Sequence, residues 1–515
     1  MKKVLLTMIS LFLLVFALSG ISYGWQGRMG GMGDPFGLVA DESDYLIHPA
    51  KIANGEGVRF YGDYRFTYTG VTDWDYNLDH FSTAGTLVNV FHFDSSGQEF
   101  THNVLLGATF PLGPGRMGLF FTYNGMRGNY HGDVDVNSVS NFEEYDLTKD
   151  FDNFALRLLY GLPVGSFKLG GEAQFAYCRE KNENWIQMTN LIQGKLNDIS
   201  GLFRPFENLL SFQFPYNSRY WETLFKGSLD GKIGPLDLEF TLRGGFLFGG
   251  ENSLLMELQN PVGTTFSRTD LNGDVTGWRI GGDLWARYPL AKDLSLPFLV
   301  GVAYQQKTRD GDGVQILGVP PAFLYRYASE ERDLGLTVGG GIDKELGPST
   351  KIAAGVYYNY LQGKNDIKLH YFASTGSGTD DSSDYPASTE HQVMLRLAGE
   401  LALSPTINLR MGFAPFYGWV KENFKYTRGS LVFGSDTDDV SLDGYHWGIV
   451  ASLGGTIKFK PITLEPFING GWQQLHLKGD GDRVDFTGAV TRLYDMSKDR
   501  DEWYIGGGFS VLYDL

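Results

Sequence analysis

The chain has 515 residues and a formal net charge of −17, with 43 Lys and Arg against 60 Asp and Glu. This negative charge argues against nucleic acid as a partner. The single cysteine, Cys178, excludes an intramolecular disulfide, and no CxxCH motif is present to attach haem. Aromatic residues make up 15% of the chain and Gly numbers 68. Together with the lack of a long apolar helical span, this composition is typical of a membrane β-barrel.

The N-terminus has the features of a secretory signal peptide. Lys2 and Lys3 precede an apolar run over 4–18, and the small residues Ser22 and Gly24 suit a cleavage site before Trp25. The run is too short to be a transmembrane helix. We therefore expect residues 1–24 to be a signal peptide and the mature protein to be exported.

The first segment with a β pattern covers residues 57–70, and residues 277–290 show the same pattern. In each, apolar side chains alternate with polar ones at period two, as expected when one face meets lipid and the other an aqueous lumen. On the lipid side of the first segment we place Val58, Phe60, Tyr64, Phe66 and Tyr68.

Short turns join such segments at 111–116, 162–167, 232–236, 289–294, 345–350, 403–407 and 458–462. The segments are about 11 to 16 residues long, enough to cross a bilayer at the usual tilt. Longer polar stretches, such as 374–390 and 434–444, indicate loops on the opposite side. With the terminal segments 57–70 and 501–515, we predict an all-β, antiparallel transmembrane β-barrel over 57–515 with about sixteen strands, fourteen being possible.

The C-terminus has the pattern of a closing strand, with a lipid-facing row formed by Trp503, Ile505, Phe509, Val511, Tyr513 and Leu515. It resembles the terminal strand of outer-membrane barrels, in which Phe is more usual than Leu at the last position. We therefore expect the protein in the outer membrane of a Gram-negative-type cell, with the membrane lipid as a partner.

The glycine-rich stretch at 27–37 is not a phosphate-binding loop, because such a loop follows a strand and here a signal peptide precedes it. The sequence VADESDYLIHPAKIA at 39–53 resembles instead the mature N-terminus of the outer-membrane long-chain fatty acid transporter family. Its barrel pattern is also similar to that of 16-stranded porins. The transporter family has fourteen strands and an Asn where this chain has His48. The resemblance implies an N-terminal plug over 25–56 in the periplasmic mouth, held by Asp41, His48, Pro49 and Ala50.

Helical spacing interrupts the β pattern between residues 181 and 217. Apolar side chains recur there at steps of three or four, and Pro205 would kink such a helix. We expect a helical third extracellular loop that either packs on the barrel or receives an apolar ligand, as the third loop of the transporter family does; a protein contact is a further alternative. Its apolar face comprises Trp185, Met188, Ile192, Leu196, Ile199 and Phe203.

Charged residues fall on the inward positions of many strands. They either select solutes across a constriction or brace neighbouring strands. The lumen-lining set is Arg65, Arg157, Glu172, Glu239, Arg243, Arg279, Asp283, Arg287, Arg396, Glu400 and Arg410.

No enzyme, metal or cofactor motif is apparent. The nine His form no HExxH, and DLNGD at 270–274 and DGDGV at 310–314 lack the closing Glu of a calcium loop, so we interpret them as solvated loop tips. The pattern predicts a channel or transport protein for diffusion or uptake of small molecules, with hydrophobic ones among the candidates. The alternatives are a general polar-solute porin and a barrel scaffold of a secretion or electron-conduit complex. Protein partners and homo-oligomers remain open.

Overall fold

The structure is a computed structural model, which describes residues 27–32, 37–39, 42–81, 87–136, 143–188, 210–213, 216–259, 265–317, 323–347, 349–372, 378–430, 434–484 and 490–515. The expected signal peptide, 1–24, lies outside these residues.

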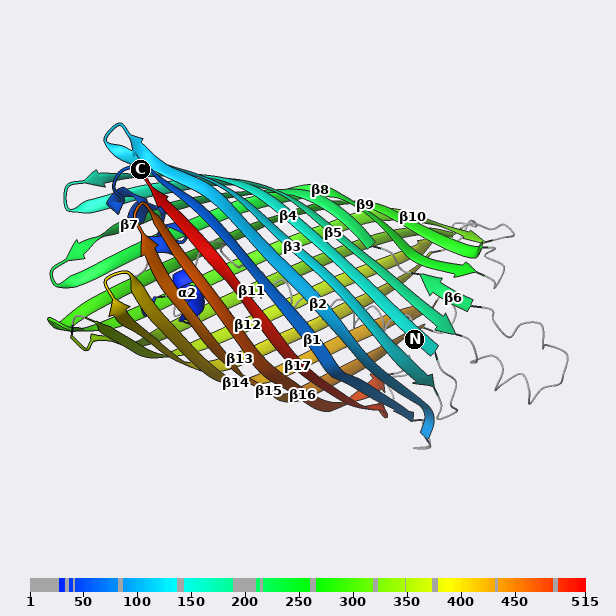
Figure 1. Ribbon diagram of the computed structural model, residues 1–515. Coiled ribbons are helices and arrows are strands. Elements are labelled where there is room, and N and C mark those ends of the chain that lie inside the picture. The colour runs from blue at the N-terminus through cyan, green and yellow to red at the C-terminus, as the bar shows by residue number, and fades with distance from the viewer. Residues whose placement is uncertain are drawn as a thin grey trace, which may run out of the picture.

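The described residues form a single antiparallel sheet that closes on itself (Figure 1). Apart from the short β6, each strand pairs with the strands next to it in sequence, and β1 also pairs with β17, which completes the ring. The short β6 lies between β5 and β8, as β7 does, so seventeen strands occupy sixteen positions. The predicted sixteen-stranded barrel is confirmed. The strands are β1 (Arg59–Phe81), β2 (Leu87–Leu112), β3 (Gly115–Val136), β4 (Glu143–Val164), β5 (Phe167–Met188), β6 (Leu210–Gln213), β7 (Tyr216–Ile233), β8 (Leu236–Gln259), β9 (Thr265–Ala291), β10 (Leu294–Leu317), β11 (Phe323–Glu345), β12 (Thr350–Phe372), β13 (Gly378–Ser404), β14 (Ile407–Ser430), β15 (Gly434–Phe459), β16 (Ile462–Val484) and β17 (Val490–Asp514).

Tight turns close the hairpins at the end of the barrel where the C-terminus lies (Figure 1). Gly113, Gly165 and Gly234 each begin a two-residue turn with φ of 59°, 63° and 61°. A positive φ at the first turn residue is what a type II′ hairpin turn requires, and glycine adopts it without steric cost. These turns define what we call the short-turn end.

The strands are longer than predicted, at 22 to 27 residues for most of them. The polar stretch expected as a loop at 374–390 belongs mostly to β13, and that at 434–444 belongs to β15. Both acidic motifs interpreted as loop tips also lie in strands, in β9 and β10. Backbone pairing continues beyond the apolar belt, where both faces of the sheet meet water and the apolar-polar alternation disappears.

The helical prediction is wrong where it can be compared with the structure. Trp185 and Met188 extend β5, pairing with Asp146 and Glu143 of β4, and residues 210–213 form β6. Ladder hydrogen bonds to β4 outweigh the local helical spacing there. The remaining members of the expected apolar face, Ile192, Leu196, Ile199 and Phe203, lie outside the described residues.

The outer face of the barrel is apolar, as the period-two pattern predicts. Phe60, Ile280 and Leu290 are exposed at 46%, 56% and 58%. In β17, Trp503, Ile505, Phe509 and Tyr513 are exposed, and Leu515 follows on the same face. Such a closed surface satisfies every backbone group while facing lipid. Within the described residues no helix is long and apolar enough to cross a membrane.

The described residues before β1 lie inside the barrel near the short-turn end (Figure 1). It contains the short helix α2 (Gly27–Gly31) and two 3₁₀ helices, η1 (Glu42–Leu46) and η2 (Pro49–Asn54). We call the described part of residues 27–57 the N-terminal segment.

Candidate functional site

The N-terminal segment contacts the lumen wall on several sides. Helix α2 packs on β14 to β17, whereas η2 packs on β3, β4, β5 and β7. The segment is buried throughout its middle, and Met29, Leu46, His48 and Ala50 are fully buried. Its residues therefore bridge the lumen rather than lie along one strand.

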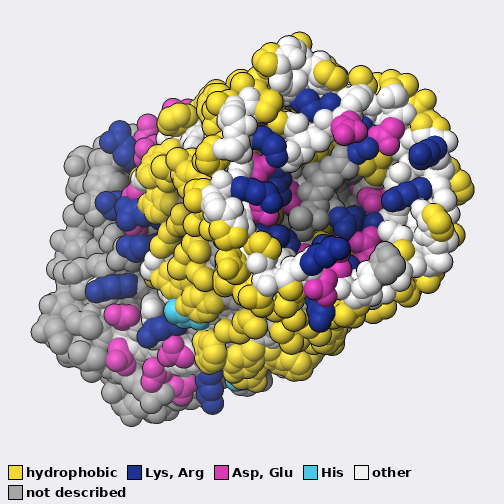
Figure 2. All heavy atoms as spheres, turned by 90° about the vertical axis from the view of Figure 1, so that its left-hand side faces the viewer, with side chains coloured by type: hydrophobic (Ala, Val, Ile, Leu, Met, Phe, Trp, Pro, Cys, Tyr) yellow, Lys and Arg dark blue, Asp and Glu magenta, His cyan; other side chains and the backbone are white. Residues whose placement is uncertain are grey.

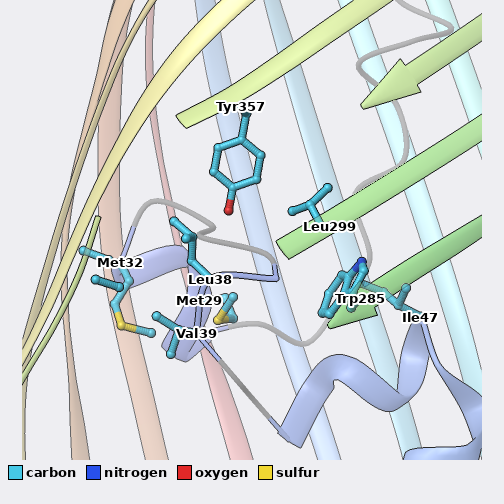
Figure 3. Close-up of a cluster of buried hydrophobic side chains, with 10 residues drawn as sticks. Met29, Met32, Leu38, Val39, Ile47, Trp285, Leu299 and Tyr357 are labelled. Atoms are coloured by element: carbon cyan, nitrogen blue, oxygen red, sulfur yellow. The ribbon is translucent and has the colours of Figure 1, made fainter. Parts of the chain in front are cut away.

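One apolar cluster joins the segment to β9, β10, β12 and β13 (Figure 3). Met29, Met32, Leu38, Val39 and Ile47 come from the segment. The wall contributes Trp285, Leu299, Ala353, Tyr357 and Ala398, with Met394 packed beside them.

A second apolar cluster holds the segment to the opposite wall. Tyr45, Leu46 and Ile52 pack there among side chains of β1 to β4 and β17. Tyr45 places its ring 6.1 Å from that of Tyr61 and 5.8 Å from that of Phe120. The two clusters together fasten the segment across the lumen.

A buried ion network binds the backbone of the segment. The carbonyl oxygen of Leu46 accepts hydrogen bonds from Arg157 Nη2 and Lys226 Nζ, both at 2.8 Å. Glu172 pairs with Arg157 at 2.7 Å and with Lys226 at 3.0 Å. Because these charges are buried, removal of one partner would leave an uncompensated charge.

Lys51 and His48 attach the segment to β8. Lys51 Nζ lies 2.8 Å from Asp44 Oδ2 and 2.9 Å from Glu239 Oε1. Burial lowers the pKa of Lys51, but the carboxylates of Asp44 and Glu239 outweigh that effect and raise its pKa above the ordinary value. Lys51 is therefore a permanent cation in this position.

The imidazole of His48 is enclosed by the wall. Its Nδ1 lies 2.7 Å from Thr241 Oγ1, its Nε2 lies 3.6 Å from Glu239 Oε2, and its ring meets that of Trp285 edge-on at 4.5 Å. Burial, followed by the positive charges of Lys51, Lys226 and Arg243, holds the pKa of His48 well below 6.5. The ring is therefore neutral at neutral pH.

Pro49 and Ala50 lie at the start of η2 against two glycines of the wall. Ala50 N donates a hydrogen bond to Ser228 Oγ at 2.6 Å. Gly161 and Gly170 are cross-strand partners on β4 and β5, and a Cβ on Gly170 would lie 2.1 Å from Ala50 N. The two glycines form a cradle in which η2 touches the barrel backbone.

Two further lumen arginines hold the first part of the segment. Arg287 Nη2 donates to the Leu38 carbonyl at 2.9 Å and also pairs with Asp343. Arg28 binds Glu400 at 2.8 Å, and Arg410 binds the same carboxylate at 3.1 Å. A cavity of about 1070 Å³ opens beside this group at the short-turn end.

The other predicted lumen residues also lie on the inward face. Arg243 pairs with Asp283 at 3.0 Å, and Arg279 pairs with Glu222 at 2.6 Å. Arg65 lies 3.8 Å from Asp63, and the guanidinium of Arg396 stacks over Tyr357. Figure 2 looks into the short-turn end, where Lys, Arg, Asp and Glu side chains gather around the opening inside an apolar outer surface.

The structure therefore brings most of the predicted site residues together around the N-terminal segment. Asp41 lies outside the described residues. Roles in lining, plugging or selecting stay predictions, because position alone does not test them. Among the described residues, no group of three or more His, Cys, Asp or Glu is placed to hold a metal.

Several residues of this site were missed in the sequence. Lys226 and Trp285 occupy inward positions, which the period-two alternation already indicates. Asp44 and Lys51 carry no such signal, since Asp44 pairs with Lys51 and the wall partner of Lys51, Glu239, lies almost 200 residues away in the sequence. Gly170 was not distinguishable from the other glycines of the barrel.

Comparison of the sequence with family models and with curated proteins finds no match. Solved structures with a similar fold include the toluene transporter TodX of Pseudomonas putida, with 11% identity and a TM-score of 0.44 over 96% of this chain and 99% of that chain. A FadL homologue of Pseudomonas aeruginosa gives 11% identity and a TM-score of 0.40 over 96% and 99%. The toluene transporter TbuX of Ralstonia pickettii gives 12% and 0.36 over 96% and 98%. A FadL homologue is thus among the solved structures to which this chain is similar.

Proposed function

We propose that the protein is an outer-membrane channel for small, chiefly apolar solutes, in which the N-terminal segment is a plug. The observation that carries this proposal is the bridging position of the segment, fastened to opposite walls of the lumen by the two apolar clusters and by the bonds to the Leu46 carbonyl. A closed barrel with its own segment across the lumen is suited to controlled passage rather than to an open pore.

The proposed location of the protein in an outer membrane rests on the chemistry of its outer surface. The outer face is a continuous apolar belt, and closed barrels of this kind occur in outer membranes. We place the short-turn end on the periplasmic side, since outer-membrane barrels have short periplasmic turns and longer extracellular loops.

The preference for apolar solutes rests on the wall beneath the segment. Trp285, Leu299, Tyr357 and Met394 face the lumen and are covered by Met29, Met32 and Leu38. When the segment moves, these wall residues line the passage, and the flexible Met394 adapts to solutes of different shape. The inward charges mostly pair with one another, as Arg243 does with Asp283, which suits bracing of strands better than selection of ions.

The proposal is tested by deleting residues 27–53 from the full chain and recording single-channel currents in planar bilayers. Neither β1 nor any later strand is removed, so the barrel still forms. We expect little steady current from the intact protein and a large increase from the deletion variant. Gln306→Ala, on the outer face of β10, serves as a control that leaves the lumen intact.

The solute class is tested on the same preparations reconstituted in liposomes. We expect the intact protein to admit a small aromatic probe and to exclude sugars of similar mass. Steady current through the intact protein, together with free passage of sugars, would show a polar-solute porin instead. A barrel that passes neither class, even after the deletion, would favour a scaffold role.

A further inference from the structure

A recess in the lumen wall holds one side chain of the N-terminal segment. Gly341 of β11 and Gly355 of β12 are cross-strand partners that face Leu38. A Cβ on Gly355 would lie 2.5 Å from Leu38 Cδ2, and a Cβ on Gly341 would lie 2.8 Å from the same atom. The tip of the Leu38 side chain therefore occupies the space that two missing side chains leave in the wall. We call this recess, formed by Gly341 and Gly355, the socket.

The side chains around the socket are apolar. Leu299, Ala353, Tyr357 and Ala398 of the wall belong to the same buried cluster as Leu38. In Figure 3, Leu38 lies beside Tyr357 and Leu299. An apolar recess takes up small apolar molecules rather than water. The socket is therefore suited to a compact apolar group, and in this structure an isobutyl group fills it.

The backbone around Leu38 directs its side chain into the socket. Gly37 has a φ of 74°, in the left-handed region that glycine adopts without steric cost. A Cβ on Gly37 would lie 2.8 Å from Leu299 Cδ2, so the chain approaches the wall closely here. The Leu38 carbonyl accepts a hydrogen bond from Arg287 Nη2 at 2.9 Å, and Leu38 is 1% exposed.

The two parts of the N-terminal segment are fastened by different forces. Ile52 also points at glycines, since a Cβ on Gly118 or on Gly161 would lie 2.7 Å from it. It belongs to η2, however, which directly follows the stretch that buried cations hold at the Leu46 carbonyl. Leu38 is seated chiefly by apolar contacts, for which an apolar solute can substitute.

We propose that the socket binds a compact apolar group of the solute, and that Leu38 occupies it as an internal substitute. The inference rests on the proposed function, because a solute in the socket displaces Leu38 and frees the first part of the plug. Solute and Leu38 exclude each other, so each weakens the binding of the other by the same factor. The solute class is an uncharged molecule with a branched alkyl group or a single aromatic ring.

The proposal is tested by thiol labelling of the full-length mature protein in detergent. Val39→Cys places a thiol next to Leu38 at a position that is 2% exposed, and Cys178→Ser removes the natural thiol. A cationic methanethiosulfonate reagent reacts with this thiol when the segment leaves the wall. We expect bromobenzene to raise the labelling rate, by about tenfold at ten times its dissociation constant. Benzenesulfonate, which has the same ring and a charge, should leave the rate unchanged.

Ile52→Cys is the matched reporter, because Ile52 is also 2% exposed and also lies against two glycines of the wall. Its labelling rate should not respond to bromobenzene. Gly355→Ala added to Val39→Cys fills the socket, so the thiol should label rapidly with or without bromobenzene. An unchanged rate for Val39→Cys would overturn the proposal. An equal increase for Ile52→Cys or with benzenesulfonate would overturn it too, as would an undiminished response after Gly355→Ala.

Labelling does not require passage through the barrel, so its failure is distinguishable from failure of the proposed function. A barrel that admits a small aromatic probe into liposomes, while Val39→Cys does not respond to bromobenzene, would overturn the socket and retain the channel. A responsive Val39→Cys in a barrel that passes no solute, even after deletion of residues 27–53, would retain the socket and overturn the channel.

Discussion

His48 and Lys51 show how single residues secure a segment inside a barrel. Lys51 lies between one carboxylate of its own segment, Asp44, and one of the wall, Glu239, so its charge is compensated from both sides. His48 is different, because its Nε2 has no hydrogen-bond partner and lies 3.6 Å from Glu239. The imidazole is tolerated there as a neutral ring, and a proton added to it would meet the positive charges of Lys51, Lys226 and Arg243.

The first consequence is a pH dependence of plug release. The pKa of His48 is held well below 6.5 in the lumen and returns to about 6.5 when the segment leaves it. The released state therefore binds the proton more readily, and acidification favours release. At pH 5.5 protonation of His48 contributes about 1.4 kcal/mol to the free energy of release, or roughly tenfold in the release equilibrium. This contribution vanishes above about pH 7.5.

The measurement is the open probability in planar bilayers between pH 7.5 and 5.5. His48→Asn removes the titrating ring but leaves Glu239 and Lys51 in place, so acidification should raise the open probability of the parent more than that of the variant. A parent and a variant with the same pH profile would assign the effect to another group.

At the scale of elements, η2 depends on two glycines of the wall. Gly161 and Gly170 lie opposite each other on β4 and β5, and η2 occupies the space that their side chains would fill. The ion pair of Arg157 with Glu172 lies on the same two strands and holds the adjoining Leu46 carbonyl. Backbone contact and buried charges therefore act on one short stretch of the segment.

Gly170→Ala should displace η2 without disturbing the barrel. The new Cβ would lie 2.1 Å from Ala50 N and 2.3 Å from Pro49 C, and backbone cannot yield as a flexible side chain does. We expect a clearly higher single-channel conductance and a thermal transition of the barrel within a few degrees of the parent. The matched control is Gly171→Ala, since the nearest atom to its Cβ would be Lys226 O at 3.7 Å. Equal conductance of the two variants would show that the cradle does not hold the plug.

At the scale of the whole molecule, the barrel separates an apolar outer face from a charged lumen. Leu284 and Asp283 are neighbours in β9, yet Leu284 is exposed at 39% on the lipid side and Asp283 pairs with Arg243 in the lumen. The side chains alternate in this way between the lipid face and the lumen face along the strands, because successive side chains point to opposite faces. A bilayer and a water-filled lumen can therefore lie on the two sides of a single layer of backbone.

Substitutions at these two positions should have different effects. Leu284→Arg places a charge in the apolar belt and should destabilise the barrel by about 2 to 4 kcal/mol if it lies near the bilayer midplane. Asp283→Asn leaves the belt intact and should alter permeation instead, because Arg243 loses its partner. Chemical denaturation in lipid vesicles measures the first effect and bilayer conductance the second. Similar losses of stability at both sites would contradict the observed register.

The sequence by itself determined the barrel and the inward or outward direction of its side chains, and it predicted about sixteen strands with fourteen possible. These features depend on a local rule, the period of two along a strand, together with turns whose residues can be recognised. It also indicated that residues 39–53 belong with a plug motif. In the polar outer parts of the hairpins the same rule failed, because a strand with water on both faces shows no alternation.

Only the tertiary structure decided what the N-terminal segment contacts and how far the strands extend. His48 meets Thr241 across 193 residues of sequence, and the partners of Lys51 and Leu46 come from strands that closure of the ring brings around the segment. The pair of Gly341 and Gly355 that receives Leu38 likewise depends on the register between strands. The register of the strands and the closure of the barrel are set by hydrogen bonds between distant segments, so a local sequence pattern does not predict them.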